Sequence, residues 1–410
     1  MTKINNLIIL ITFTLIVFTG CQPNAQVTQP NEENNQTSVE TEDPNTKYKP
    51  AFEGQTRIKK VKTSTPLDVS VINEGMKRPW AIVQMPDGRF LITEKSGFFR
   101  ILGQDGSLQK EIKGLPEVDD DDQGGLLDVA LDPDFSTNRM MYWSYSQPND
   151  KGNLTAVAKG KLSEDESKLE NIKVIFRATP VFKSSLHFGS RLQFDKDGYL
   201  FVSGGERSHK EGRVQAQDLK SGLGKIFRIT KDGKAAPGNP FIGNSNAMPE
   251  IYAYGIRNAQ GLDIHPITGE LWELEYGPKG GDEVNIIKAG KDYGWPTITY
   301  GLEYSGDPIG SSITQKNGME QPVYYWDPVI SPSGISFYAS DIIPEWRNNL
   351  FIGALSGTHI CRLVIDQNKI TGEERLLEDK GERFRDVVDG SDGALYAITD
   401  SGKLYRVKKK

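Results

Sequence analysis

Residues 252–285 read YAYGIRNAQGLDIHPITGELWELEYGPKGGDEVN, and this stretch contains the pattern that decides the fold. An apolar run, GLDI, is followed by a turn around Pro266 and then by LWELE, a second run of strand length. Two such runs joined by a short turn are typical of a β-hairpin. The stretch therefore predicts two neighbouring antiparallel strands.

The same strand-turn-strand pattern occurs six times along the chain. The copies are residues 80–95, 126–146, 190–206, 261–277, 334–355 and 384–407. Their irregular spacing indicates insertions between copies of one repeated unit. Repeats of this size predict an all-β fold, a six-bladed β-propeller of four-stranded antiparallel blades. A pair of β-sandwiches is the alternative, but it does not require one hairpin pattern to recur six times.

The strand VSVINEG, Val69 to Gly75, precedes the first copy. We expect it to pair with the last blade and close the ring, because closure removes an open sheet edge. Six blades leave a narrow central channel, and the loops at one end of that channel are the expected ligand site. The formal net charge of −6 argues against a nucleic-acid partner.

The N-terminus predicts a targeting segment. Lys3 precedes the apolar run LIILITFTLIVF, Leu7 to Phe18, which suits a signal peptide better than a membrane span. The following Thr-Gly-Cys resembles a bacterial lipobox. Residues 1–20 are therefore the expected signal peptide, and lipid on Cys21 would anchor the protein to the bacterial cell membrane, outside the cytoplasm. Plain secretion, with Cys21 an incidental thiol, is the alternative.

Residues 21–60 are rich in Asn, Gln, Thr, Glu and Pro and contain few large apolar side chains. Such a composition cannot bury enough surface to offset chain entropy, so it predicts a flexible, disordered linker. The propeller is expected to span residues 61–410. With Cys21 lipidated, Cys361 has no partner, and no disulfide framework is expected.

His187, in SSLHFGSRLQF, is the candidate general base, because an accessible imidazole exchanges protons near neutral pH. A histidine that only fills a loop is the alternative. Arg257 and Asn258 form a fork of donors suited to carboxylate or ketone oxygens. The loop Gly277 to Glu283 offers backbone carbonyls and two carboxylates that suit calcium. An ordinary surface turn with an ion pair is the competing interpretation.

Arg383 and Arg385, in ERFRDVV, lie on one face of a predicted strand because alternate residues point the same way. With Arg257 they form a set of cations suited to a ligand with several carboxylates. Salt bridges to neighbouring acids are the alternative. Gln123 stands before two glycines at the entrance to the second copy, and by itself it indicates only a loop.

Seven phrases together resemble those of one family. They are GLLDVALDPDF, HFGSRLQF, LGKIFRI, YGIRNAQGL, EYGPKGGDEVN, YGWP and RFRDVV, in this order. The chain from Leu67 to Val407 resembles the soluble quinoprotein glucose and aldose sugar dehydrogenases, also called the glucose/sorbosone dehydrogenase family. The resemblance implies a six-bladed propeller that binds pyrroloquinoline quinone (PQQ) at the channel mouth, with a calcium ion against the cofactor.

The resemblance also implies a reaction, the oxidation of an aldose at C1 to a lactone, with an external electron acceptor. His187 would take the proton of the anomeric hydroxyl while hydride passes from C1 to the quinone. Arg257 and Asn258 would bind the quinone oxygens, and Arg257 would stabilise the negative charge that develops there. Gln123 would contact cofactor or substrate.

Four further positions carry implied roles in cofactor and metal binding. The carbonyls of Gly277 and Pro278 would bind calcium, and Arg383 and Arg385 would pair with cofactor carboxylates. The chain departs from the family at Ser356, where the soluble glucose enzymes carry a lysine.

The residue before His187 is Leu186, where relatives often carry an acidic or polar residue, so nothing adjacent in sequence orients the base. These departures leave a second function open, a non-catalytic, lipid-anchored propeller that binds a sugar or a cell-wall fragment. A metal-dependent hydrolase of lactones or esters is a third, but the chain shows no ring of Asn, Asp and Glu ligands for it.

Overall fold

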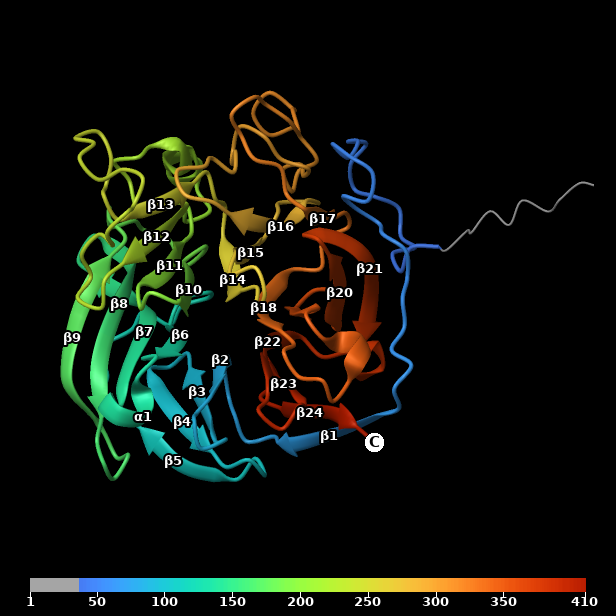
Figure 1. Ribbon diagram of the computed structural model, residues 1–410. Coiled ribbons are helices and arrows are strands. Elements are labelled where there is room, and N and C mark those ends of the chain that lie inside the picture. Colours follow the sequence, from blue (N-terminus) through green and yellow to red (C-terminus); the bar gives the residue numbers. More distant parts are fainter. Residues whose placement is uncertain (1–36) are drawn as a thin grey trace, which may run out of the picture. The chain divides into compact units, whose positions relative to one another are not determined.

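The computed structural model describes residues 37–410. The predicted signal peptide, Cys21 and the first part of the predicted linker lie outside these residues. The described chain forms six four-stranded antiparallel sheets, arranged as blades around a central axis (Figure 1). The predicted six-bladed β-propeller is confirmed.

The first three blades follow one another along the chain. Blade 1 contains β2 (Pro79–Gln84), β3 (Phe90–Glu94), β4 (Phe98–Leu102) and β5 (Leu108–Ile112). Blade 2 contains β6 (Leu126–Leu131), β7 (Met140–Asn149), β8 (Gly152–Leu162) and β9 (Leu169–Arg177), with the short helix α1 (Phe135–Asn138) between β6 and β7. Blade 3 contains β10 (Gly189–Phe194), β11 (Leu200–Gly204), β12 (Lys225–Ile229) and β13 (Ile251–Tyr254), with α2 (Lys210–Arg213) and the 3-10 turn η1 (Val214–Gln217) after β11.

The remaining three blades complete the ring. Blade 4 contains β14 (Ala259–Ile264), β15 (Leu271–Glu275), β16 (Asp282–Ile287) and β17 (Tyr324–Trp326). Blade 5 contains β18 (Pro332–Phe337), β19 (Leu350–Ala354), β20 (Ile360–Asp366) and β21 (Lys369–Leu376), with η2 (Pro344–Trp346) before β19 and η3 (Glu378–Lys380) after β21. Blade 6 contains β22 (Phe384–Asp389), β23 (Leu395–Thr399), β24 (Leu404–Lys409) and β1 (Leu67–Asn73).

Ring closure follows the prediction. The first strand, β1, pairs antiparallel with β24, with Leu67 opposite Lys409. The first strand of each blade is the innermost, because β2, β6, β10, β14, β18 and β22 contact one another in a closed series. The six copies of the sequence pattern therefore hold the two inner strands of each blade.

Apolar faces of neighbouring blades form the core between them. Between blades 1 and 2, for example, the rings of Phe99 and Trp143 meet edge to face, with centroids 5.9 Å apart. Both side chains are fully buried within one hydrophobic cluster. Aromatic and β-branched residues suit these positions because they cover a pleated surface well. Cys361 is buried in blade 5 as a free thiol.

Three aspartates join alternate pairs of blades near the axis. Asp128 in β6, Asp263 in β14 and Asp386 in β22 each accept a backbone N–H from the inner strand of the next blade, at 2.7, 2.8 and 2.9 Å. Arg191 bridges two of them, 3.3 Å from Asp128 and 3.1 Å from Asp386. Its guanidinium also lies 4.1 Å from the ring of Trp80. These contacts join blades 1, 2, 3 and 6 around the axis.

Residues 37–60 do not form the flexible linker that the sequence predicted for them. Asp327 accepts hydrogen bonds from the backbone N–H and the hydroxyl of Thr46, at 3.0 and 2.8 Å. Glu40 pairs with Arg375 at 2.6 Å, and Gln55 is fully buried. The flexible linker predicted for residues 21–60 is therefore wrong for residues 37–60. Polar side chains hold this segment to the blades by hydrogen bonds, which a composition argument based on apolar burial does not detect.

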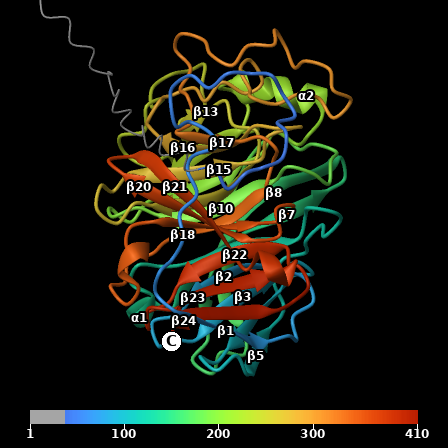
Figure 2. The same cartoon turned by 90° about the vertical axis from the view of Figure 1, so that its right-hand side faces the viewer.

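Figure 2 shows the N-terminal segment, in blue, passing along the outside of the propeller. Lys60 forms a parallel bridge with Glu373 in β21, which adds a backbone contact to that outer edge. Within residues 37–410, no helix is long and apolar enough to cross a membrane.

Candidate active site

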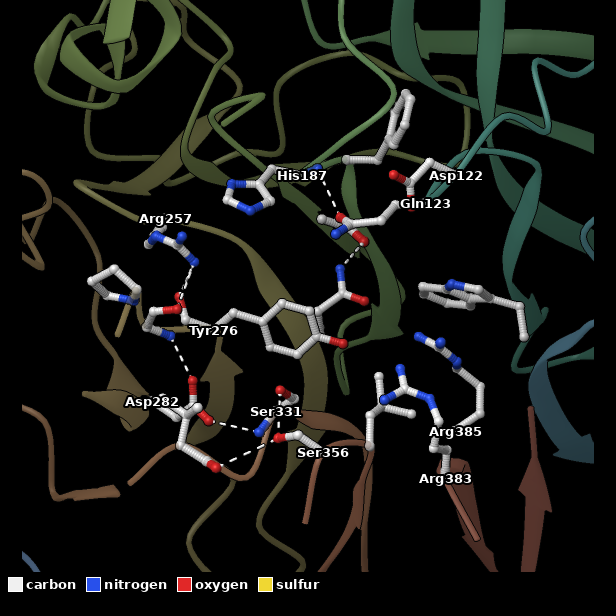
Figure 3. Close-up of a pocket in the computed structure, with 18 of the residues that line it drawn as sticks. Asp122, Gln123, His187, Arg257, Tyr276, Asp282, Ser331, Ser356, Arg383 and Arg385 are labelled. Carbon is white, nitrogen blue, oxygen red and sulfur yellow. Dashed lines mark hydrogen bonds between the residues drawn. The ribbon is translucent and has the colours of Figure 1, made fainter. Parts of the chain in front are cut away.

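A cavity of about 370 Å³ lies at one end of the central channel, and residues from all six blades or their loops line it (Figure 3). The structure brings most of the predicted site residues together there. Those that line it are Gln123, His187, Arg257, Gly277, Pro278, Arg383 and Arg385. Of the candidate cofactor, metal and catalytic residues, only Asn258 is not part of the cavity lining, and the roles of the others stay predictions.

His187 lies on the wall of the cavity, just before β10. Its backbone has a φ of 48°, a left-handed conformation that non-glycine residues seldom adopt. The amide oxygen of Gln123 accepts the His187 N–H at 2.9 Å and so holds this conformation. Gln123 thus positions the candidate base from blade 2, a role that its isolated place in the sequence did not indicate.

Glu206 orients the imidazole. Its Oε1 lies 2.8 Å from Nδ1 of His187, and both side chains are buried. A carboxylate only accepts hydrogen bonds, so Nδ1 carries the proton and Nε2 is left as the basic nitrogen. Burial and the charge of Arg257 lower the pKa of His187 to about 4, whereas Glu206 raises it. The imidazole is therefore neutral at neutral pH and ready to accept a proton.

Sequence reasoning missed Glu206 because it searched only next to His187. The carboxylate comes from the loop after β11, the second strand of the same blade, and is 19 residues away. A signal was present in the phrase SGGERS, where an acidic residue follows two glycines at the end of an inner strand. Gly205 allows close approach there, since a Cβ on it would lie 2.1 Å from the carbonyl of His187.

Arg257 is buried between blades 3 and 4. Its Nη1 donates to the carbonyls of Tyr276 and Gly277, both at 2.8 Å, and its guanidinium lies 5.2 Å from the ring of Trp295. Its Nε has no hydrogen-bond partner in residues 37–410. A buried donor without a partner is costly, so a ligand oxygen at this position would be favoured.

Asn258 lies behind the cavity wall rather than on it. Its side chain is fully buried, and its Oδ1 accepts the N–H of Gly189 at 3.0 Å. Its Nδ2 is a second buried donor that has no partner in the part of the chain described. The prediction that Asn258 binds a cofactor oxygen is not tested by this geometry, which shows Asn258 supporting the strand that follows His187.

Asp282 shapes the Gly277-Pro278 turn. Its Oδ1 accepts the N–H of Gly277 at 2.7 Å, and its Oδ2 accepts those of Ile330 and Ser331 at 2.8 and 2.7 Å. Burial raises the pKa of Asp282 to about 7. Because both oxygens bind backbone donors, Asp282 holds the turn in place, and its suggested contact with a cation stays a prediction.

No cluster of three or more His, Cys, Asp or Glu side chains suited to a metal ion occurs between residues 37 and 410. The candidate cation ligands at the turn are the backbone carbonyls of Gly277 and Pro278. One of these, that of Gly277, already accepts the guanidinium of Arg257.

Arg383 and Arg385 project from the start of blade 6 into the cavity (Figure 3). Both pair with the carboxylate of Asp400, at 2.9 and 2.8 Å. The salt bridges of the alternative interpretation are present, and the arginines also line the cavity, so their pairing with ligand carboxylates stays a prediction. One carboxylate cannot neutralise two guanidinium groups, so this end of the cavity has a surplus of positive charge.

Ser356 lies on the blade 5 side of the same cavity. Its hydroxyl is 2.8 Å from that of Ser331. This wall therefore offers hydroxyl groups at the position where the family resemblance predicts a lysine.

Fold and site together define a propeller enzyme whose central cavity holds an oriented base beside a cluster of cations. The family model described as glucose/sorbosone dehydrogenase matches residues 76–406. The chain belongs to this family of oxidoreductases, as its sequence motifs predicted.

Individual relatives agree with this assignment. The aldose sugar dehydrogenase YliI of Escherichia coli is 43% identical over 349 residues, which make up 84% of this chain and 93% of that protein. The crystal structure of the soluble aldose sugar dehydrogenase of Escherichia coli in its apo form superposes with a TM-score of 0.81 at 42% identity, over 84% of this chain and 100% of that one. The PQQ-bound aldose sugar dehydrogenase of Streptomyces coelicolor superposes with a TM-score of 0.69 at 26% identity, over 85% of this chain and 99% of that one.

Proposed function

We propose that this protein oxidises an aldose at C1 to a lactone, with pyrroloquinoline quinone as cofactor, calcium as its metal and an external electron acceptor. The observation that carries the proposal is the neutral His187, held by Glu206 at 2.8 Å in a cavity that also contains Arg257. The names of the relatives, which are aldose sugar dehydrogenases, supply the substrate class. The PQQ-bound relative supplies the cofactor.

The residues present fit such a cofactor. It is a planar quinone with several carboxylates. At one side the cavity wall offers a buried donor on Arg257 that has no partner within residues 37–410, and a second such donor, on Asn258, lies behind the wall. Arg383 and Arg385, which share a single carboxylate, lie at another. We infer that Arg257 and Asn258 hold the quinone oxygens and that the two arginines of blade 6 hold carboxylates. When bound, the cofactor supplies the acceptor for the hydride that leaves C1.

The chain's own residues handle the proton and the charge. Nε2 of His187 takes the proton of the sugar's C1 hydroxyl, and Glu206 stabilises the imidazolium that forms. Arg257 supplies fixed positive charge where negative charge develops on oxygen. Gln123 keeps His187 in its strained backbone conformation by accepting its N–H. The site thus acts mainly by orientation and by charges already in place.

The proposed calcium ion would lie at the Gly277-Pro278 turn. The carbonyls of Gly277 and Pro278 are the candidate ligands, yet calcium takes six to eight oxygens. The remaining oxygens would come from the bound cofactor and from water, and the ion would share the Gly277 carbonyl with Arg257 or displace it.

The test is reconstitution of the purified protein with pyrroloquinoline quinone and calcium. Dye reduction with a panel of aldoses should appear only with cofactor present, NMR should identify the lactone, and EGTA should weaken cofactor binding. Absence of both cofactor binding and turnover would overturn the proposal. Sugar binding that survives chelation and needs no cofactor would instead support the non-catalytic propeller.

We also propose that the enzyme works outside the cytoplasm, anchored by lipid on Cys21. This proposal rests on the apolar run Leu7 to Phe18 and the lipobox-like sequence before the cysteine. Mass spectrometry of protein extracted from membranes should find an acylated N-terminal Cys21. A mature chain that begins at Met1 would contradict it.

A further inference from the structure

Lys95 is a cavity residue to which neither the sequence motifs nor the proposed mechanism assigns a role. It follows β3, and its backbone is fixed on both sides. Its N–H donates to the carbonyl of Arg78 at 3.0 Å, and its carbonyl accepts the N–H of Leu126 at 2.9 Å. A Cβ on Gly125 would lie 2.4 Å from the Lys95 carbonyl, so only glycine allows blade 2 to approach this closely. The side chain therefore starts from a rigid position on the cavity wall.

The ammonium group of Lys95 has no carboxylate partner. No ion pair links it to any acid in residues 37–410, and its contact is with the backbone carbonyl of Asp122. Arg383 and Arg385 in the same cavity share Asp400. Of the four cations that line this cavity, Lys95, Arg383 and Arg385 thus have one directly bound carboxylate among them. Half-buried charges are ordinarily paired, so the arrangement favours an anion from outside the chain.

The surroundings of Lys95 support the same conclusion. Burial, together with the charges of Arg78 and Arg385, lowers the pKa of Lys95 to about 8, while Asp400 and Asp122 oppose the shift. These four charged groups come from the segment before β2, from β22, from the loop after β23 and from the loop before β6. All are arginines or aspartates, whose charges stay constant between about pH 7 and 9.

We propose that the ammonium of Lys95 binds an anionic group of the cofactor, a carboxylate of pyrroloquinoline quinone, from the blade 1 side of the cavity. The inference rests on the proposed function, because it assigns to the same ligand a further cation besides Arg257, Arg383 and Arg385. It adds a binding residue on the wall next to Arg385. This residue belongs to none of the seven family motifs. A lysine that serves the fold is held more completely in this chain: the ammonium of Lys225 donates to three backbone carbonyls, whereas that of Lys95 donates to one and lines the cavity.

A bound carboxylate raises the pKa of an ammonium group. At a pH where Lys95 of the cofactor-free protein is partly deprotonated, cofactor binding is therefore coupled to protonation of Lys95. Affinity should therefore fall as the pH rises through about 8, by up to about tenfold per pH unit. Lys95→Arg keeps its charge at every pH tested and should show no such fall. Lys95→Met should bind the cofactor weakly at all pH values, and its affinity should likewise not depend on pH.

The experiment is equilibrium titration of the cofactor-free full chain with pyrroloquinoline quinone, followed by calorimetry or by quenching of tryptophan fluorescence, between pH 7 and 9.5. We expect Lys95→Met to raise Kd about 10- to 100-fold at pH 7, the usual effect of losing one charged hydrogen bond. Lys113→Met is the matched control, because Lys113 belongs to the same blade, carries the same charge and is 73% exposed. It should bind like the wild type.

The outcomes separate this inference from the proposed function. Normal affinity and an unchanged pH slope in Lys95→Met would overturn the role of Lys95 while leaving the cofactor assignment intact. No binding by the wild type would overturn both. A thermal scan of the cofactor-free variants identifies misfolding: Lys95→Met should keep or raise Tm, because it removes an uncompensated charge, and a marked fall would show a structural lysine instead.

Discussion

Replacement of His187 by alanine is expected to lower kcat about a thousandfold while leaving cofactor affinity close to that of the wild type. General-base catalysis contributes about 10²- to 10⁴-fold in enzymes, and no other imidazole lines the cavity. The measurement is steady-state dye reduction with an aldose, combined with a cofactor titration. Because Gln123 bonds the backbone of residue 187 rather than its ring, alanine should keep the loop in place.

The control for this variant is His209→Ala. His209 is exposed at the start of α2, in the same loop as Glu206 but outside the cavity. It should retain full activity. A His187→Ala enzyme within about threefold of the wild type would show that another group, or water, takes the proton.

The pH profile gives a second measure of the same group. Burial and Arg257 lower the pKa of His187 to about 4, so the base stays neutral down to mildly acidic pH. Activity that depends on it should be lost only as the pH falls through about 4. An exposed histidine with an ordinary pKa near 6.5 would already be mostly protonated at pH 5. Loss of kcat/KM with a midpoint near 6.5 would contradict the buried pair.

Glu206→Gln is expected to lower kcat about a hundredfold with little change in KM. A carboxylate can only accept from Nδ1, whereas an amide can also donate to it, which would place the proton on Nε2 and remove the base. Loss of Glu206 also removes the contribution that raises the pKa of His187, against the larger effects of burial and Arg257 that lower it. The acid limb of the pH profile should therefore move to lower pH. A purely structural role would not produce that shift.

Glu211→Gln provides the matched control, because Glu211 is exposed on α2 and loses the same charge. It should change neither kcat nor the pH profile. An acid limb that stays in place in Glu206→Gln would refute the role of Glu206 in orienting the base, even if activity fell.

Much of the site could be predicted from sequence because its motifs fall at corresponding ends of repeated units. Arg257, Gly277 and Arg383 all lie where an inner strand begins or ends, and all line one cavity. Residues outside such motifs were harder to assign. The partners of Glu206 and Lys95 lie in other loops. Asn45 and Thr46, in the segment 37–60, bond to Asp327, which is 282 and 281 residues away in sequence. Neither periodicity nor composition reports contacts at that range.

The sequence by itself determined the blades, because a hairpin depends on its own turn and on alternation along its own strands. It also determined that the ring would close through β1 and β24. The strand before the first copy had no partner, and pairing it with the last blade removes an open sheet edge. Only the tertiary structure decided which side chains meet at the axis. Arg191 reaches Asp386 across 195 residues of chain, and His187 faces Glu206 rather than any neighbour in sequence. The Arg191–Asp386 pair forms only once the ring has closed, and the His187–Glu206 pair forms once blade 3 has brought two of its loops together, because folding fixes the separation and burial of their charges.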